Sequence, residues 1–189
     1  MNIKSTLAAV SVCMLAAGSA GAAVIDFTTA TNDGTTAVAA GATAVAAAGD
    51  SLFIGDFVEN TICSLGGGGC NGIFTLTFDA DVSSMSFHYG TGDAGDTATL
   101  SIFDSLMALV DTVVLVSASD ADGEIANYVL SGIGNFRSIV FDNSAAEGAG
   151  YAYGNIEYDS AAVVPLPATL PLLLAGMAGL GLLRRKRQA

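Results

Sequence analysis

Phe74-Thr-Leu-Thr-Phe78 decides the fold, because large apolar residues alternate strictly with threonine along its whole length. Successive side chains of a β-strand point to opposite faces, so a period of two predicts a strand with one buried and one polar face. The same alternation returns in Met85-Ser-Phe-His-Tyr89 and in Ala98-Thr-Leu-Ser-Ile102. These runs predict half-buried strands that share one core.

Further strands are expected on both sides of this central region. They are residues 24–27 and 51–54 before it, and 113–117, 126–130, 136–141 and 151–158 after it. Turns rich in Gly, Asp and Asn separate them, as in residues 90–96 and 121–124. Short strands at regular spacing, without a helical period, predict one all-β domain over residues 24–158, an antiparallel β-sandwich of jelly-roll type.

Residues 37–48 are the exception to this pattern. They read Ala-Val-Ala-Ala-Gly-Ala-Thr-Ala-Val-Ala-Ala-Ala. Alanine favours helix, but the stretch has no polar face and Gly41 interrupts it. We therefore expect either a short helix or a loosely ordered crossing segment here.

Residues 1–22 have the layout of a secretory signal peptide. Lys4 precedes an apolar run over residues 7–17, and small residues follow in Ala20-Gly-Ala22. Cleavage is expected after Ala22 or Ala23, which removes Cys13 together with the peptide. The rest of the chain is therefore predicted to be exported.

The C-terminus carries a second segment in three parts. Val164-Pro-Leu-Pro-Ala-Thr169 is followed by an apolar run over residues 170–183 and by Arg184-Arg-Lys-Arg187. The prolines keep the motif extended and short of backbone donors, while a basic cluster stays on the cytoplasmic side of a membrane. A helix over residues 168–183 would be roughly 24 Å long against roughly 30 Å of bilayer hydrocarbon, which suits a temporary anchor. An ordinary anchor that is never cut is the alternative.

This order of motif, transmembrane helix and basic tail resembles the PEP-CTERM sorting signal of Gram-negative bacteria. The motif is carried by Val164, Pro165, Leu166 and Pro167, and the tail by Arg184, Arg185, Lys186 and Arg187. Leu166 departs from the glutamate that the family usually has there. The resemblance makes residues 164–189 the sorting signal, and the short polar and small residues just before it predict a linker over residues 159–163.

The resemblance also implies partners and a location. An exosortase-like enzyme would process the chain, which would be anchored briefly in the inner membrane and then reach the cell surface or the extracellular space. Proteins with this tag are commonly associated with exopolysaccharide and with biofilm or floc formation.

The body between the two signals is strongly acidic. Residues 24–163 contain one basic residue, Arg137, against all eighteen acids, a formal charge of −17. Nucleic acid is excluded as a partner, because phosphate binding needs lysines and arginines that the body lacks. Such a body stays soluble and attracts divalent cations.

Calcium is the one cofactor that this composition suits, because acidic turns offer the oxygen ligands that it prefers. The candidate residues are Asp93 with Asp96, and Asp120 with Asp122. Residues 120–123 match the middle of an EF-hand loop, but Ala118 and Val129 occupy its first and last ligand positions. We therefore favour solvated turn formers over a calcium site in both turns.

Cys63 and Cys70 are the only cysteines of the body, and Gly66 to Gly69 lie between them. In an oxidising exterior such a pair predicts a small disulfide loop. A closed zinc site would need more ligands than two cysteines and one histidine. A catalytic pair of cysteine and His88 is a third, disfavoured alternative.

Catalytic residues are scarce in the body. His88 is the single histidine of the chain, and no Gly-x-Ser-x-Gly motif accompanies it. We expect a strand histidine at the surface and no enzyme. Tyr151, Tyr153 and Tyr158 offer an aromatic face for sugar stacking, but we favour sheet packing with the hydroxyl tips at the surface.

Three classes of function remain. The preferred class is a non-catalytic exported surface or extracellular-matrix protein, as the sorting signal implies. A carbohydrate-binding module is the alternative, supported by the predicted sandwich architecture alone. A secreted hydrolase comes last, because the body offers acids in abundance but no recognisable catalytic pair.

Overall fold

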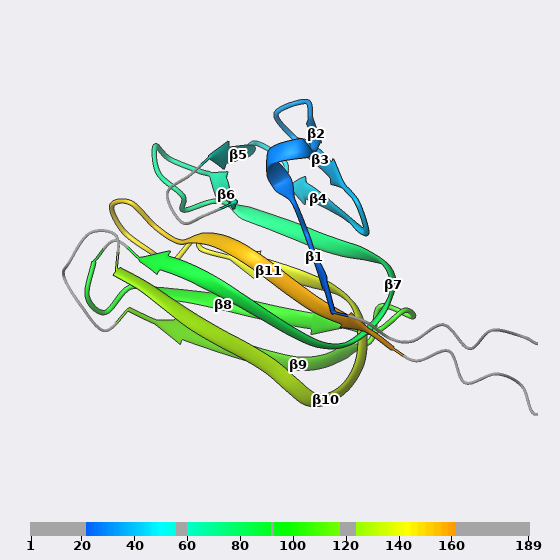
Figure 1. Cartoon of the computed structure of the whole chain (residues 1–189). Coiled ribbons are helices and arrows are strands. Elements are labelled where there is room, and N and C mark those ends of the chain that lie inside the picture. Colours follow the sequence, from blue (N-terminus) through cyan, green and yellow to red (C-terminus); the bar gives the residue numbers. More distant parts are fainter. Residues whose placement is uncertain (1–21, 56–59, 92, 118–123, 162–189) are drawn as a thin grey trace, which may run out of the picture. The chain divides into compact units, whose positions relative to one another are not determined.

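The computed structural model describes residues 22–55, 60–91, 93–117 and 124–161 (Figure 1). Apart from one 3-10 turn the described chain is all-β, as predicted. Its elements are β1 (Ala22–Val24), η1 (Phe27–Thr29), β2 (Thr31–Asn32), β3 (Thr36–Ala39), β4 (Ala42–Ala46), β5 (Ser51–Gly55), β6 (Thr61–Leu65), β7 (Ile73–Thr91), β8 (Thr97–Phe103), β9 (Leu109–Val116), β10 (Glu124–Asp142) and β11 (Ala152–Ser160).

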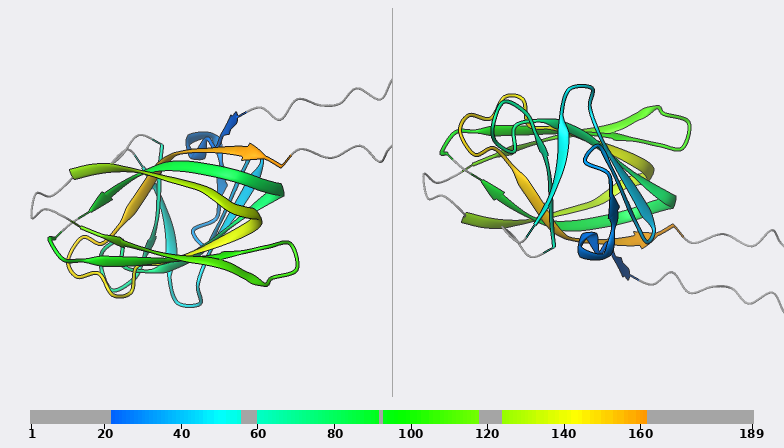
Figure 2. Two further views of the ribbon diagram at one scale, coloured as in Figure 1. Left: turned by 90° about the horizontal axis from the view of Figure 1, so that it is seen from below. Right: turned by 90° about the horizontal axis from the view of Figure 1, so that it is seen from above.

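The strands lie in two layers that face each other across the core, as both views of Figure 2 show. The first layer has the order β2-β3-β4-β7-β10-β8-β9. In the second layer β11 pairs with β7 on one side and with β1 and β6 on the other, and β5 pairs with β6. The named strands pair antiparallel throughout, which is the predicted β-sandwich. The jelly-roll assignment stays a prediction.

The long strands β7 and β10 belong to both layers. The first half of β7 pairs with β4 and with the second half of β10, and its second half pairs with β11 and the first half of β10. The register of β10 on β7 shifts between Ser131 and Ser138, where Gly132 and Gly134 have φ of 76° and 92°. Bulges with left-handed glycine bend a strand. The strand pair turns from one layer to the other at this corner.

This bend corrects two of the expected boundaries. Residues 74–78 and 85–89 are parts of one strand, β7, and residues 126–130 and 136–141 are parts of β10. The glycines that suggested a turn between the last two runs form a bulge instead. At the N-terminus, β1 ends at Val24, and Asp26 caps η1 by accepting a hydrogen bond from the Thr28 N–H at 2.9 Å.

Residues 37–48 correct a further expectation, because they form most of a β-hairpin and neither a helix nor a loose segment. The register of β3 on β4 runs from Thr36↔Val45 to Ala39↔Ala42, which leaves Ala40 and Gly41 as the turn. The buried positions are Ala37, Ala39, Ala42 and Ala44. Their period of two shows that packing against the sheet overrides the helix propensity of alanine.

Aromatic side chains from both layers fill the core. The Phe74 and Phe141 rings of the first layer stack with centroids 4.6 Å apart. Tyr153 of the second layer lies 4.5 Å from Phe141, and Phe87 lies 6.1 Å from Phe141. Each buried side chain of this size contributes about 1.5–3 kcal/mol of transfer free energy. The alternation that begins at Phe74 therefore sets which face of each layer is buried.

Candidate functional site

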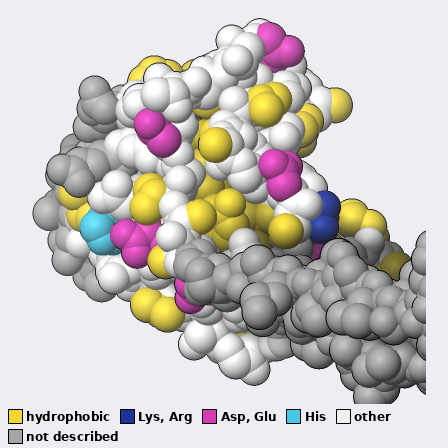
Figure 3. Space-filling view, turned by 45° about the vertical axis from the view of Figure 1, so that its right-hand side comes forward, with side chains coloured by type: hydrophobic (Ala, Val, Ile, Leu, Met, Phe, Trp, Pro, Cys, Tyr) yellow, Lys and Arg dark blue, Asp and Glu magenta, His cyan; other side chains and the backbone are white. Residues whose placement is uncertain are grey.

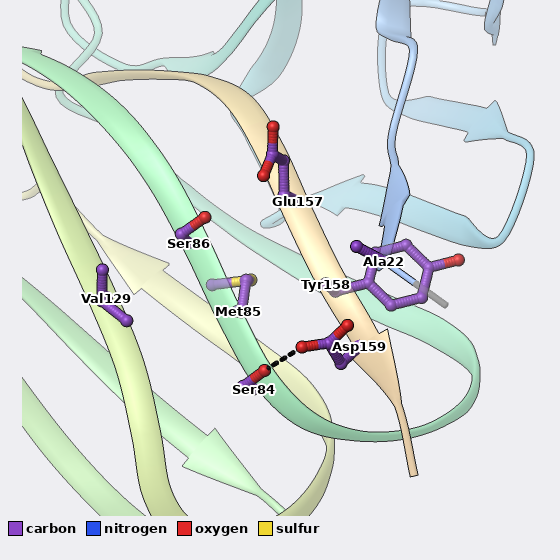
Figure 4. A pocket seen from close by; sticks show the side chains of 8 residues that line it. All are labelled: Ala22, Ser84, Met85, Ser86, Val129, Glu157, Tyr158 and Asp159. Carbon is purple, nitrogen blue, oxygen red and sulfur yellow. Dashed lines mark hydrogen bonds between the residues drawn. The ribbon is translucent and has the colours of Figure 1, made fainter. Parts of the chain in front are cut away.

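A pocket opens on the outer face of the second layer, where β1, β11, β7 and β10 lie side by side (Figure 4). Its volume is about 240 Å³, and we refer to it as the outer pocket. The residues that line it are Ala22 of β1, Glu157, Tyr158 and Asp159 of β11, Ser84, Met85 and Ser86 of β7, and Val129 of β10.

Strand register places the polar groups of the outer pocket side by side. Ser86 is paired with Glu157 on one side and with Val129 on the other, and Ser84 is paired with Asp159. Ser84 Oγ donates a hydrogen bond to Asp159 Oδ2 at 2.7 Å, which Figure 4 draws as a dashed line. Two hydroxyls, two carboxylates and one aliphatic side chain therefore converge on a small concave surface.

Negative charge dominates this region. The Glu157 side chain is exposed and that of Asp159 is half-buried, so solvent reaches both. The only basic side chain of the described residues, Arg137, pairs instead with Asp81 at 3.5 Å. Figure 3 shows acidic side chains as separate patches on one face, together with one basic patch and the histidine. An anionic ligand would be repelled here, whereas a neutral ligand rich in hydroxyls would not.

The disulfide predicted from sequence is present. Cys63 and Cys70 are joined with an S–S distance of 2.08 Å and Cα atoms 5.5 Å apart. Between them, the Gly66 N–H donates to the Gly69 carbonyl at 3.1 Å and tightens the turn. Both cysteines are buried and pack with Phe53. Neither sulfur is therefore a metal ligand or a nucleophile.

The tyrosines of the last strand offer no aromatic face. All three are buried, so sheet packing was predicted correctly, whereas a hydroxyl tip at the surface was wrong for Tyr151 and Tyr153, which have no exposed surface. Tyr151 Oη donates to the Asp96 carbonyl at 2.7 Å, and Tyr153 Oη donates to Asn143 Oδ1 at 2.6 Å. Burial raises the pKa of Tyr151 to about 12 and that of Tyr153 well above its usual value.

Of the two acidic turns, only residues 93–96 are described, and Asp120 and Asp122 lie outside the described residues. The Asp96 N–H donates to the Asp93 carbonyl at 3.2 Å. Asp96 is buried: its Oδ1 accepts the Glu147 N–H at 3.1 Å, while its Oδ2 has no hydrogen-bond partner. No three acidic, histidine or cysteine side chains in the described part are placed to hold a metal ion. At residues 93–96 solvated turn formers remain the prediction and calcium remains the disfavoured alternative.

The remaining sequence candidates fall into two groups. His88 is partly exposed on β7, with Nδ1 3.4 Å from Asn155 Nδ2, which fits the expected strand histidine. The sorting motif 164–167 and the basic tail 184–187 lie outside the described residues. Among the residues that are described, no helix has the length and apolarity to cross a membrane.

Sequence reasoning did not single out the outer pocket. The alternation of residues 85–89 places Ser86 on a polar strand face, but the partners of Ser84 and Ser86 on β11 are about seventy residues away in the chain. The sequence feature that marks the outer pocket is a pair of polar-apolar-polar triplets, Ser84-Met-Ser86 and Glu157-Tyr-Asp159. Only the register of β11 on β7 shows that the two triplets are neighbours.

Comparison with known proteins gives similarity at the level of solved structures alone. No family model matches the chain, and no curated protein does. A family 29 carbohydrate binding module in complex with mannohexaose has a TM-score of 0.47 at 16% identity, covering 75% of this chain and 93% of the module. A second family 29 module, from Piromyces equi, has a TM-score of 0.46 at 12% identity, covering 79% and 96%.

A cleaved adhesin domain of Lys-gingipain is similar to the same degree. Its TM-score is 0.47 at 12% identity, covering 73% of this chain and 99% of that domain. These values are too low to assign the chain to either kind of protein. Its function has to be argued from its own residues.

Proposed function

We propose that the protein is a non-catalytic exported surface protein whose β-sandwich binds neutral saccharides in the outer pocket. The observation that carries this proposal is the pairing of Ser84 with Asp159 and of Ser86 with Glu157 on neighbouring strands. Carboxylates only accept hydrogen bonds, serine hydroxyls donate and accept, and sugar hydroxyls do both. A sugar diol would therefore satisfy both kinds of group at once.

The charge and size of the outer pocket limit the class of saccharide that it can bind. Its two carboxylates, in a body of formal charge −17, disfavour acidic polysaccharides. Its 240 Å³ is below the roughly 300–1,000 Å³ of pockets for drug-sized ligands. We therefore expect one residue of a neutral chain to enter, with the exposed Val129 against the C–H face of the ring. Because Tyr158, the one aromatic residue that lines the pocket, is only 8% exposed and offers little ring surface for stacking, the expected dissociation constant is about 1 mM.

The arrangement of the carboxylates supports a binding role rather than hydrolysis. A glycosidase places two carboxyl groups on opposite sides of the scissile bond. Glu157 and Asp159 instead stand two residues apart on the same face of one strand, β11, and so form a single wall. His88, the only histidine, lies beside an asparagine amide and not in the outer pocket.

Export is supported by the disulfide, because such bonds persist in oxidising compartments. Residues 1–21 of the predicted signal peptide and the whole sorting signal over 164–189 lie outside the described residues, and both signals remain predictions. In this proposal an exosortase-like enzyme cuts the chain near Pro165 and Pro167. The acidic body then reaches the cell surface or matrix, where a neutral exopolysaccharide is its ligand.

Affinity electrophoresis of the exported protein in gels with soluble mannan, glucan or acidic alginate tests this proposal. We expect retardation by a neutral polymer and none by alginate. A double variant with Glu157→Gln and Asp159→Asn keeps the shape of the outer pocket but weakens its acceptors, so affinity should fall at least about tenfold. The exposed Asp79, on the opposite half of β7, provides Asp79→Asn as the control with unchanged binding.

Several outcomes would overturn the proposal. Undiminished binding by the double variant would place the saccharide elsewhere. A protein that no neutral polymer retards would not be a saccharide-binding protein at all. Release of reducing ends from a polymer, lost in the double variant, would assign hydrolase chemistry to the same carboxylates.

A further inference from the structure

A second surface, on the outer side of the first layer, has a different chemistry. Its outward residues form rows that cross six neighbouring strands from β3 to β9. One complete row is Thr36, Val45, Thr75, Val140, Ser101 and Thr112. The adjacent row, again from β3 to β9, is Val38, Thr43, Thr77, Ser138, Phe103 and Leu109. We refer to these two rows as the threonine-valine face.

The threonine-valine face contains no charged side chain. Three of its five apolar residues are open to solvent, with Val38 exposed at 51%, Val45 at 44% and Leu109 at 59%, while Val140 and Phe103 are half-buried. One acid flanks the face on each side: Asp142, whose Oδ1 already accepts hydrogen bonds from the Ser144 N–H and Oγ at 3.0 and 2.6 Å, and the exposed Asp79, which follows Thr77 on the same face of β7. The face is thus uncharged and mixed, with seven Thr or Ser side chains and five apolar ones. On a body of −17, two uncharged rows across six strands indicate a contact surface.

The loop that joins β8 to β9 adds two exposed apolar side chains beside this face. Asp104 Oδ1 accepts the N–H groups of Leu106 and Ala108 at 2.8 and 2.9 Å and so holds the loop closed. Met107 has φ of 63°, a conformation that costs a non-glycine residue about 1–2 kcal/mol. Met107 Sδ lies 3.9 Å from Ser138 Oγ, and Leu106 is 86% exposed. A strained, hydrogen-bonded loop thus presents Leu106 and Met107 to solvent.

We propose that the threonine-valine face and this loop bind a second copy of the same chain. Sheet faces pack on one another by interdigitating β-branched side chains about 10 Å apart. Two bodies of −17 repel, and they approach most easily through a face without carboxylates. In a two-fold pair, Leu106 and Met107 of each copy would pack on the rows of the other.

The area of the threonine-valine face and the loop sets the expected affinity of the dimer. Side chains on one face of a sheet occupy a grid of roughly 4.8 by 6.8 Å, so the two rows, without the buried Ser138, cover about 360 Å². With the loop, the two copies would bury on the order of 1,000 Å², the lower end for specific interfaces. We therefore expect a weak dimer with a dissociation constant of about 100 μM, favoured by salt because screening removes the repulsion.

Sedimentation velocity of the exported protein, over a range of concentrations and at low and high sodium chloride, tests this proposal. We expect a monomer–dimer equilibrium that shifts to dimer as salt rises. Leu106→Ser combined with Met107→Asn removes both anchors while asparagine keeps the left-handed turn, so the dissociation constant should rise at least about tenfold. Ile125→Thr, which changes an apolar side chain of 52% exposure on β10 outside the threonine-valine face, should leave it unchanged.

The result also separates this inference from the proposed function. The variant with Leu106→Ser and Met107→Asn should keep its affinity for neutral polysaccharide, since these changes do not alter the outer pocket. A wild-type monomer at all concentrations and salts overturns the inference, as does a dimer that survives in the double variant. Association that appears only with added polysaccharide assigns the threonine-valine face to that polymer instead of a second copy.

Discussion

Gly41 has no room for a side chain in the β3–β4 turn. Its φ is 88°, and a Cβ built there would collide with the Tyr158 hydroxyl. We expect Gly41→Ala to lower the free energy of unfolding by about 2–4 kcal/mol, since backbone strain and overpacking add. Gly34→Ala is the matched control, because Gly34 has φ of 93° but no atom within 4 Å of the added Cβ. Equal losses in urea unfolding would show that the contact with Tyr158 is unimportant.

Tyr151 makes the stability of the fold depend on alkaline pH. Burial raises its pKa from 10.0 to about 12, so the folded state favours the neutral phenol more strongly than the unfolded state does. The resulting stabilisation is complete below pH 10 and is lost as pH rises towards 12. Thermal melts from pH 8 to 12 should show this loss, and Tyr151→Phe should reduce it. If melting temperature falls with pH as steeply in Tyr151→Phe as in the wild type, Tyr153 is the source of the pH dependence.

Asp96 holds a buried carboxylate oxygen without a hydrogen-bond partner. Replacing it by asparagine removes the buried charge and retains the acceptor for the Glu147 N–H. We expect Asp96→Asn to raise the free energy of unfolding by about 1 kcal/mol, and Asp93→Asn, at an exposed position, to leave it unchanged. Calcium that stabilises the wild type beyond sodium at matched ionic strength, with the effect lost in Asp96→Asn, would contradict this and assign a cation site.

Among the elements, the β6–β7 connection is shaped by a covalent link. The Cys63–Cys70 bond closes a loop of a few residues, and the chain-entropy estimate for its contribution is about 2.5 kcal/mol. We expect the double variant Cys63→Ala and Cys70→Ala to lose about this much in urea unfolding. Reduction of the wild type should match it. Two alkylatable thiols in the native exported protein would show instead that the bond does not form.

The strands show how far a sequence pattern carries. Alternation placed Phe74 and its neighbours correctly, because one buried face leaves the same period of two in the chain. It failed at residues 37–48, where every residue is small or apolar and alanine propensity pointed to helix. It also divided β10 at its bulge, since glycine marks a bend and a turn in the same way. The outer pocket could not be predicted, because the register between strands that are distant in the chain is not encoded in any short stretch of sequence.

At the scale of the whole molecule, the two ends of the body meet. Ala22 at the start of β1 is paired with Asp159 near the end of β11, so the described chain begins and ends at the same end of the sandwich (Figure 1). Both residues also line the outer pocket. The predicted cleavage after Ala22 or Ala23 would therefore remove Ala22 from the outer pocket. The mature chain would keep the other seven lining residues, including Ser84, Ser86, Glu157 and Asp159.

Processing at the C-terminus is the prediction on which location depends. An apolar run too short to span comfortably, preceded by Pro165 and Pro167 and followed by four basic residues, is suited to halt export briefly and present the motif outside the membrane. Replacing both prolines by alanine should leave uncut protein in the membrane fraction, while Pro171→Ala, outside the motif, should be processed normally.

The basic tail gives a second test of the same segment. Neutral residues at 184–187 should weaken membrane retention before the cut, because the cytoplasmic anchor is lost. Mass spectrometry of the surface protein decides the matter: a C-terminal peptide that still ends at Ala189 would make the segment a plain anchor and remove the exosortase-like enzyme as a partner.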